Sequence, residues 1–151
     1  MEDIFDTISK TKIRLKLDIG KTFHQIDVHP DDIPKTAFAC KFGIFEWTKM
    51  PFGLVNGSAM FQRNMDIILK DYLWKFVVVY INDIIIYLDI PEEHQKHVAI
   101  VKEILSKHGF SLNEDKCEFF KDKLQILGHV ISNEGIKPSE SKIEAINNTK
   151  L

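Results

Sequence analysis

The feature that most constrains this chain is a pair of apolar runs that flank one polar pair. The runs are Phe76–Tyr80 and Ile84–Tyr87, and Asn82-Asp83 lies between them. Short runs of β-branched and aromatic residues around a polar pair predict a buried β-hairpin with that pair at its tip. A carboxylate presented by an apolar hairpin is a candidate functional group. Asn and Asp are also common turn residues, because both tolerate positive φ angles.

The composition is that of an ordinary globular domain. The 151 residues are 44% hydrophobic and 28% charged, which suits a single domain able to bury a core. The net charge of −2 gives no overall signature of nucleic-acid binding, so such a function must rest on local patterning. We expect the two distant cysteines, Cys40 and Cys117, to be free buried thiols.

The sequence has no targeting or membrane-spanning signal. The acidic N-terminus lacks the basic and then apolar layout of a signal peptide, and no apolar run approaches 18 residues. We therefore expect an intracellular protein, cytoplasmic or nuclear, with no membrane partner.

Several other segments carry strand patterns. Ile13–Asp18 alternates strictly, which predicts a half-buried strand with two cations and then Asp18 on its polar face. We also expect strands over residues 23–28, 118–120 and 124–132, and a hairpin over 37–47 broken at Phe42-Gly43.

Helical spacing appears in three places. It predicts helices over residues 59–73, 91–109 and 139–147, the first with Ser58 as its N-cap and the second with Gly109 after its end. Strands in the middle with helices interspersed indicate an α+β fold, an antiparallel sheet with helices packed on one face.

Two groups of charged or titratable residues have ordinary explanations. His94 and His97 could be drawn as a zinc site, but we expect them on the polar face of an exposed helix and set that idea aside. Five cations could form a basic strip or could be evenly spread surface charge: Lys12, Arg14, Lys16, Lys35 and Lys41.

Several short motifs occur in an order and spacing that are more specific together than any is alone. They are Leu17-Asp18-Ile19-Gly20-Lys21-Thr22-Phe23, Pro34-Lys35-Thr36-Ala37-Phe38, Met50-Pro51-Phe52-Gly53, Phe61-Gln62-Arg63, Tyr80-Ile81-Asn82-Asp83, Leu112-Asn113 with Lys116-Cys117, and Leu127-Gly128-His129. Together they resemble the reverse transcriptase domain of gypsy-type LTR retrotransposon Pol polyproteins, over about residues 4–147.

The resemblance implies a part of a right-handed polymerase. Residues 1–151 would form a single domain, the palm with part of the fingers, and the thumb, connection and RNase H parts would be absent. The implied activity is that of a nucleotidyltransferase, an RNA-directed DNA polymerase. Its implied partners are an RNA or DNA template–primer duplex and dNTP, and other Pol segments or a second polymerase chain.

The implied metal site is incomplete in this copy. In the family, three acids hold two Mg²⁺ ions, and Asp18 and Asp83 match the first and the last of them. Asn82 occupies the middle position. An amide is uncharged, while Mg²⁺ prefers hard anionic oxygens in octahedral geometry. We therefore expect Mg²⁺ binding by Asp18 and Asp83 to be weak or absent, and the copy to be degenerate.

The nucleotide pocket is also implied by the resemblance. Phe23 matches the ring that excludes a ribose 2′-OH, although it could be an ordinary core residue. Lys21 and Thr22 replace the small residues whose backbone faces the triphosphate, and Phe52 matches a loop under the incoming base.

Five further residues match the primer and template contacts of the family. They are Gly53, Gln62, Arg63, Gly128 and His129. Arg63 could equally belong to a solvated helix face, and Gly128 could mark a bulge. The alternative to a polymerase domain is a catalytically dead relic, which serves as a nucleic-acid- or protein-binding module or as a scaffold.

Overall fold

The computed structural model describes residues 2–118, 123–126, 128–132 and 135–148. At its centre is an antiparallel sheet of β1 (Ile13–Asp18), β5 (Asp83–Leu88) and β4 (Val77–Tyr80), in that order. β4 and β5 form the expected hairpin, and the central β5 pairs along its whole length with β1. This pairing brings a strand from the start of the chain beside the polar hairpin tip.

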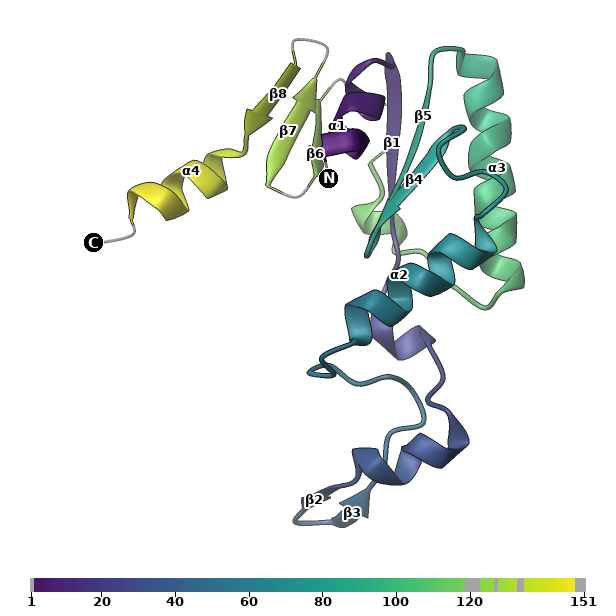
Figure 1. The fold of residues 1–151 in the computed structure, drawn as a ribbon, viewed down its shortest axis with the longest axis vertical. Coiled ribbons are helices and arrows are strands. Elements are labelled where there is room, and N and C mark those ends of the chain that lie inside the picture. Colours follow the sequence, from purple (N-terminus) through teal and green to yellow (C-terminus); the bar gives the residue numbers. More distant parts are fainter. Residues whose placement is uncertain (1, 119–122, 127, 133–134, 149–151) are drawn as a thin grey trace.

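Two helices cover one face of the central sheet, as expected (Figure 1). They are α2 (Gly57–Ile68) and α3 (Pro91–Lys107). The main apolar core lies in this layer, where sheet residues meet side chains from both helices: Leu15, Leu17, Ile84 and Ile86 from the sheet, Phe61 and Met65 from α2, and Val101 and Leu105 from α3. Gly109, with φ of 80°, follows the end of α3 as predicted.

The opposite face is covered by α1 (Glu2–Ser9) and by a second antiparallel sheet (Figure 1). That sheet has the order β6 (Lys123–Ile126), β7 (His129–Ser132) and β8 (Gly135–Pro138), and α4 (Glu140–Asn147) follows it. A second apolar cluster joins the two sheets through Ile85 and Tyr87 on β5 and Leu124 and Ile131 on β6 and β7. The central sheet is therefore buried on both faces.

Burial of the second face changes the role of Arg14. Its side chain is 1% exposed, and it donates hydrogen bonds from Nε to the Ile8 carbonyl (2.9 Å) and from Nη2 to the Ser9 carbonyl (3.2 Å). These carbonyls belong to the last turn of α1, where helices leave acceptors unpaired. Arg14 is thus a structural cap, and the hypothesis of a basic strip loses one of its members.

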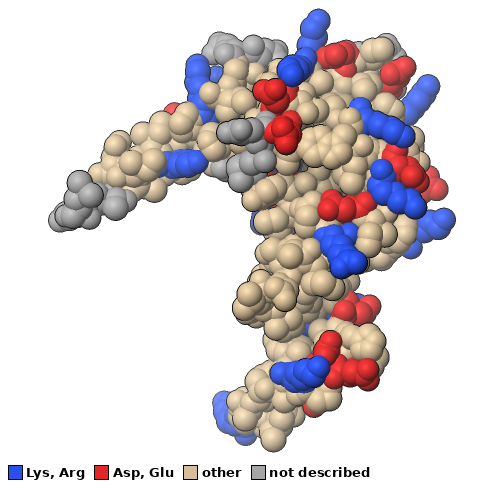
Figure 2. All heavy atoms as spheres, viewed as in Figure 1, with Lys and Arg blue, Asp and Glu red and all other residues tan. Residues whose placement is uncertain are grey.

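A lobe of residues 20–56 extends below the central sheet in Figure 1. It contains the helical turns η1 (Thr22–Gln25) and η2 (Pro30–Thr36) and the short hairpin of β2 (Phe38–Cys40) and β3 (Gly43–Phe45). All six strand residues of that hairpin are exposed. Figure 2 shows acidic and basic side chains interspersed over the visible face, while much of the lobe carries neither.

Several predicted boundaries were wrong. The strand expected over 23–28 is the turn η1 and an irregular segment, which bonds to a loop through Val28 N–H to Thr48 O and Met50 N–H to Ile26 O. The helix expected from 59 to 73 begins at Gly57 after Asn56 and ends at Ile68, so Ser58 is not its cap. Ser139 does cap α4, since its hydroxyl accepts the Lys142 N–H.

The strand expected over 124–132 is two strands, β6 and β7, because Gly128 turns the chain with φ of 72°. Of the strand expected over 118–120, only Glu118 is described, and it forms an isolated bridge with Lys16. Residues 119–120 and Leu127 lie outside the described residues.

Three predictions of exposure were also wrong. His94 is fully buried, and the His97 ring stacks on Phe76 with 3.7 Å between centroids, so neither lies on an exposed polar face. Cys40 is exposed rather than buried, and Cys117 is partly buried; both thiols are free. None of the helices in the described ranges is long and apolar enough to cross a membrane.

Candidate functional site

The pairing of β1 with β5 brings together three residues that are far apart in the sequence. Asp18 is the direct cross-strand partner of Asp83, and Ile19 N–H donates to the Asn82 carbonyl (3.4 Å). Residues directly opposite each other in an antiparallel pair point to the same face of the sheet. The metal site implied by the resemblance requires Asp18, Asn82 and Asp83 to converge, and the structure confirms this convergence, although their chemical roles stay predictions.

The tip of the hairpin is held in an unusual backbone conformation. Its turn residues are Ile81 and Asn82, and the positive φ falls on Ile81 (51°), a β-branched residue that rarely adopts it. The conformation therefore cannot be explained by the turn preferences of Asn82 and Asp83, as the simple turn interpretation required.

Gln62 on α2 holds this tip from the helical side. Its Oε1 accepts the Ile81 N–H (2.7 Å), and its Nε2 donates to the Val79 carbonyl (3.2 Å) and to Asp66 Oδ1 (2.9 Å). The sequence assigned Gln62 to the template. In the structure its carboxamide bonds to the hairpin, and a contact with the template stays a prediction.

A small cavity of about 150 Å³ lies at this edge of the sheet. One wall of the cavity is formed at the edge of the sheet by Asp18 and by Asn82 of the hairpin turn. The other walls come from the loop that follows β1, from Phe52, and from the segment that follows α3. The residues are Asp18, Ile19, Gly20, Lys21, Thr22, Phe23, Phe52, Asn82, Asn113 and Lys116. All four residues that the resemblance assigned to nucleotide binding are among them.

The loop after β1 takes its shape from local bonds. Lys21 has φ of 48°, and the Thr22 hydroxyl donates to the Ile19 carbonyl (2.8 Å), which begins the turn η1. The Phe23 ring then packs edge-to-face on Phe52 (5.5 Å) and Phe61 (6.4 Å). Phe23 thus lines the cavity and also packs against the core. Its position is compatible with both sequence interpretations, a ring in the nucleotide pocket and an ordinary core residue.

Sequence reasoning assigned no role to Ile19 and Gly20 in the loop after β1, and it missed two lining residues from the segment after α3, Asn113 and Lys116. Asn113 N–H donates to the Asp18 carbonyl (2.9 Å), and the adjacent Leu112 bridges to Ile19. Both residues stand in a motif that the resemblance included without assigning it a role. Their presence in a recognised motif was the only available signal.

Asp83 has a different environment from Asp18. Its Oδ1 lies 3.7 Å from Lys16 Nζ, and the same ammonium lies 3.5 Å from Glu118 Oε1. Burial raises the pKa of the Asp83 carboxyl; Lys16 opposes this rise, and the nearby charge of Asp18 adds to it. Asp83 is absent from the described lining of the cavity.

The predicted primer and template residues do not gather at the cavity. Gly53 is next to Phe52 and has φ of 91°, while Arg63 is an exposed residue of α2. Gly128 lies in the turn before β7, and His129 begins β7 of the second sheet, where its ring packs on Phe5 and its Nε2 lies 3.4 Å from Lys142 Nζ. The structure therefore brings together the predicted nucleotide residues but not the five primer and template residues.

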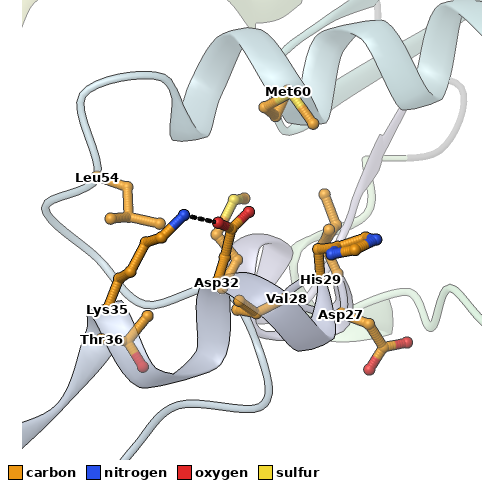
Figure 3. A pocket seen from close by; sticks show the side chains of 10 residues that line it. Asp27, Val28, His29, Asp32, Lys35, Thr36, Leu54 and Met60 are labelled. Atoms are coloured by element: carbon orange, nitrogen blue, oxygen red, sulfur yellow. Dashed lines mark hydrogen bonds and ion pairs between the residues drawn. The ribbon is translucent and has the colours of Figure 1, made fainter.

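A larger cavity of about 400 Å³ lies within the lobe. Figure 3 shows Met60 of α2 on one side and Asp32 and Lys35 of η2, joined as an ion pair, on the other. Its interior is apolar, with Ile26, Val28 and Leu54 among its walls. None of the residues that the resemblance assigned to metal, nucleotide, primer or template binding lines it, so its size alone does not make it the functional site.

The donor set at the hairpin tip does not fit two divalent ions. Asp18 is the one carboxylate in the described lining of the small cavity, and Asn82 offers a neutral oxygen. Within the described ranges, no cluster of three or more His, Cys, Asp and Glu residues is arranged to hold a metal ion. Two ions held in a shared site need several anionic oxygens, and the described lining of the cavity supplies them from Asp18 alone.

The chain is similar to a known family and to known proteins over most of its length. A family model described as reverse transcriptase (RNA-dependent DNA polymerase) matches residues 2–131. The chain is 40% identical over 146 residues to the Pol polyprotein of transposon 297 of Drosophila melanogaster, and 33% identical over 143 residues to that of transposon gypsy. These matches cover 97% and 95% of the chain but 14% of each relative.

Solved structures show the same fold. A foamy viral protease–reverse transcriptase in complex with an RNA/DNA hybrid matches with a TM-score of 0.83 at 23% identity, over 97% of this chain and 20% of that one. The native prototype foamy virus enzyme matches with a TM-score of 0.75 at 28% identity, over 90% of this chain and 18% of that one. The chain therefore belongs to the reverse transcriptase family, as a domain of the kind found in retrotransposon Pol polyproteins.

Proposed function

We propose that this chain is an RNA-directed DNA polymerase domain that has lost the two-metal step of phosphoryl transfer. The observation that carries the proposal is the position of Asn82. It lines the small cavity beside Asp18, at the place where the family has its middle acid. Replacing that acid by an amide removes a full charge from the group that would have to bridge two cations.

The proposal retains the nucleotide side of the site. Lys21, Thr22, Phe23 and Phe52 line one cavity with Asp18, and this shared lining supports a dNTP pocket at this edge of the sheet. Phe23 is fixed by rings on two sides, and so it can act as a rigid wall against a ribose 2′-OH. The partners that we propose are therefore dNTP and an RNA or DNA template–primer duplex. Because the relatives are much longer than this chain, we also propose other Pol segments as partners.

Primer extension tests the loss of the chemical step. We expect the 151-residue chain to incorporate no dNTP on an RNA or DNA template with Mg²⁺ or Mn²⁺. Extension that depends on the template and disappears in Asp18→Ala would show that the copy is active. Labelled duplex and dNTP provide a separate binding measurement, in which affinity for the duplex should fall as salt is raised.

Asn82→Asp tests the cause of that loss. We expect the variant to bind Mg²⁺ more tightly and to be less stable without metal, because the added carboxylate lies close to Asp18 and Asp83. Thermal unfolding with and without several millimolar Mg²⁺ measures both effects, since a ligand of the native state raises its stability by mass action. An equal Mg²⁺ response in variant and parent would mean that the tip does not form a metal site.

The alternative is a relic that serves as a nucleic-acid- or protein-binding module or as a scaffold. The interspersed charges on the face shown in Figure 2 do not form a basic groove. If the duplex binds with no dependence on salt, or does not bind, the domain is better described as a scaffold. Duplex binding without dNTP binding would favour a nucleic-acid-binding module.

A further inference from the structure

The ammonium group of Lys16 stands at a junction of three segments beside the proposed site. Its Nζ lies 3.7 Å from Asp83 Oδ1 and 3.5 Å from Glu118 Oε1, and it donates to the Gln125 carbonyl (3.2 Å). The Lys16 side chain is 16% exposed and that of Asp83 is 21% exposed. An ion pair shielded to this extent is screened less than an exposed surface pair.

Backbone hydrogen bonds also fix the position of Lys16 relative to Glu118. Lys16 N–H donates to the Glu118 carbonyl (3.0 Å), and Glu118 N–H donates to the Lys16 carbonyl (2.9 Å). Gln125 lies on β6, so the lysine also ties the central sheet to the second sheet. Lys16 is therefore fixed at its main chain and at its charged end.

The position of Asp83 follows from this arrangement. Its carboxylate is paired with Lys16, whereas the described lining of the small cavity contains Asp18 and Asn82 without Asp83. A fixed ammonium group supplies the opposite charge that a divalent cation would otherwise supply, and a cation close to it would be repelled.

We propose that Lys16 is a positioning residue, which holds the Asp83 carboxylate at the junction with the second sheet and withholds it from a cation bound at Asp18. The proposal rests on the function proposed above. In this chain the Asp83 carboxylate therefore has a structural role. Asp18 and the side-chain amide oxygen of Asn82 form the position that binds a cation weakly. Lys16 and Asn82 together then explain why three converging residues do not make a metal site.

Mn²⁺ binding to the 151-residue chain tests the proposal, with free Mn²⁺ measured by electron paramagnetic resonance. The variants are Asp18→Asn, Asp83→Asn, Lys16→Met and the double variant Lys16→Met/Asp83→Asn. Methionine keeps the apolar stem of the lysine and removes its charge. Lys10→Met is the matched control, because Lys10 also pairs with an acid, Asp6, but its side chain is 73% exposed.

We expect Asp18→Asn to weaken Mn²⁺ binding and Asp83→Asn to change the affinity of the parent by less than about twofold, since Asp83 is engaged elsewhere. Lys16→Met should tighten binding about fivefold to tenfold by releasing Asp83, and the double variant should lose that gain. If Asp83→Asn weakens parental binding as much as Asp18→Asn does, or if Lys16→Met acts no differently from Lys10→Met, the proposal is overturned.

A second measurement applies even where Mn²⁺ binding is too weak to resolve. Urea unfolding of the parent, the two single variants at Lys16 and Asp83, and the double variant forms a double-mutant cycle. We expect the unfolding equilibrium constant of the double variant to differ by about tenfold from the product of the two single-variant fold-changes. A double variant that equals that product would show no coupling between Lys16 and Asp83 and would overturn the proposal. Template-dependent primer extension by the parent would instead overturn the proposed loss of activity, so the two failures are distinguishable.

Discussion

The central sheet and the lobe of residues 20–56 use apolar residues in opposite ways. In the sheet, Leu15, Leu17 and Ile84–Ile86 are fully buried, because helices cover one face and α1 with the second sheet covers the other. In the lobe, large apolar side chains face outward: Phe42 is 78% exposed, Ile44 76% and Val55 98%. The lobe thus exposes large apolar side chains of the kind that the central sheet buries.

The difference shows where the stability of the fold resides. Buried apolar area is the dominant favourable term in folding, and exposed apolar side chains add little to it. The site lies at the boundary between the two regions, with Asp18 and Asn82 on the rigid sheet and Lys21 to Phe23 on the first turn of the lobe. We therefore expect the two walls of the cavity to differ in stability.

The largest expected effect is at Phe61, which joins the core to the cavity wall. It is fully buried and packs edge-to-face on Phe23 and Phe110. Phe61→Ala should lower the unfolding free energy by about 3–5 kcal/mol, through lost burial and the cavity left behind. Urea unfolding measures this, with Phe42→Ala in the lobe as the matched control. Similar losses in both variants would contradict the contrast between the two regions.

Arg14→Met should have the next largest effect. The variant removes the Arg14 hydrogen bonds to the Ile8 and Ser9 carbonyls at the end of α1, from a side chain that is almost fully buried, and leaves Thr11 as the donor to Ile8. We expect a loss of about 1–3 kcal/mol in unfolding free energy. Arg63→Met, at an exposed position of α2, is the control. If the unfolding free energy falls equally little in both variants, the buried Arg14 hydrogen bonds contribute no more to stability than an exposed side chain does.

A third prediction concerns pH. Burial lowers the pKa of His94, and the neighbouring His97 lowers it further. In the unfolded chain this histidine binds a proton near pH 6.5, so as pH falls through that value the unfolded state takes up the proton first and stability decreases. The unfolding free energy should therefore fall between pH 7.5 and 5.5. The fall should be smaller in His94→Gln than in His29→Gln, whose side chain is exposed.

The smallest effect is expected in the β2–β3 hairpin. Ile44→Thr should change the unfolding free energy by less than about 0.5 kcal/mol, because the side chain is already mostly in water. Amide hydrogen exchange in the same samples should be faster in β2 and β3 than in β5. A loss above about 1 kcal/mol, or equal protection in both regions, would mean that the lobe is coupled to the sheet more strongly than its burial shows.

Local patterns in the sequence determined several elements of this protein. The alternation over Ile13–Asp18, the two apolar runs of the hairpin and the helical spacing over α3 and α4 all predicted the observed structure, with boundaries close to those found. Strand alternation and helix capping depend on neighbouring residues, so a single sequence contains the information. The motif resemblance added the convergence of Asp18 with Asn82 and Asp83.

Tertiary structure alone decided what surrounds the charged residues. Arg14, Lys16 and Asp18 share one face of β1 in the sequence pattern, yet one caps a helix, one pairs with Asp83 and Glu118, and one lines the cavity. The partners of Lys16 come from segments distant in the sequence, and Arg14 is buried because the second sheet and α1 cover this face. The free energy of each charge depends on how deeply such neighbours bury it. The same reason explains why His94 was expected in solvent and lies in the core.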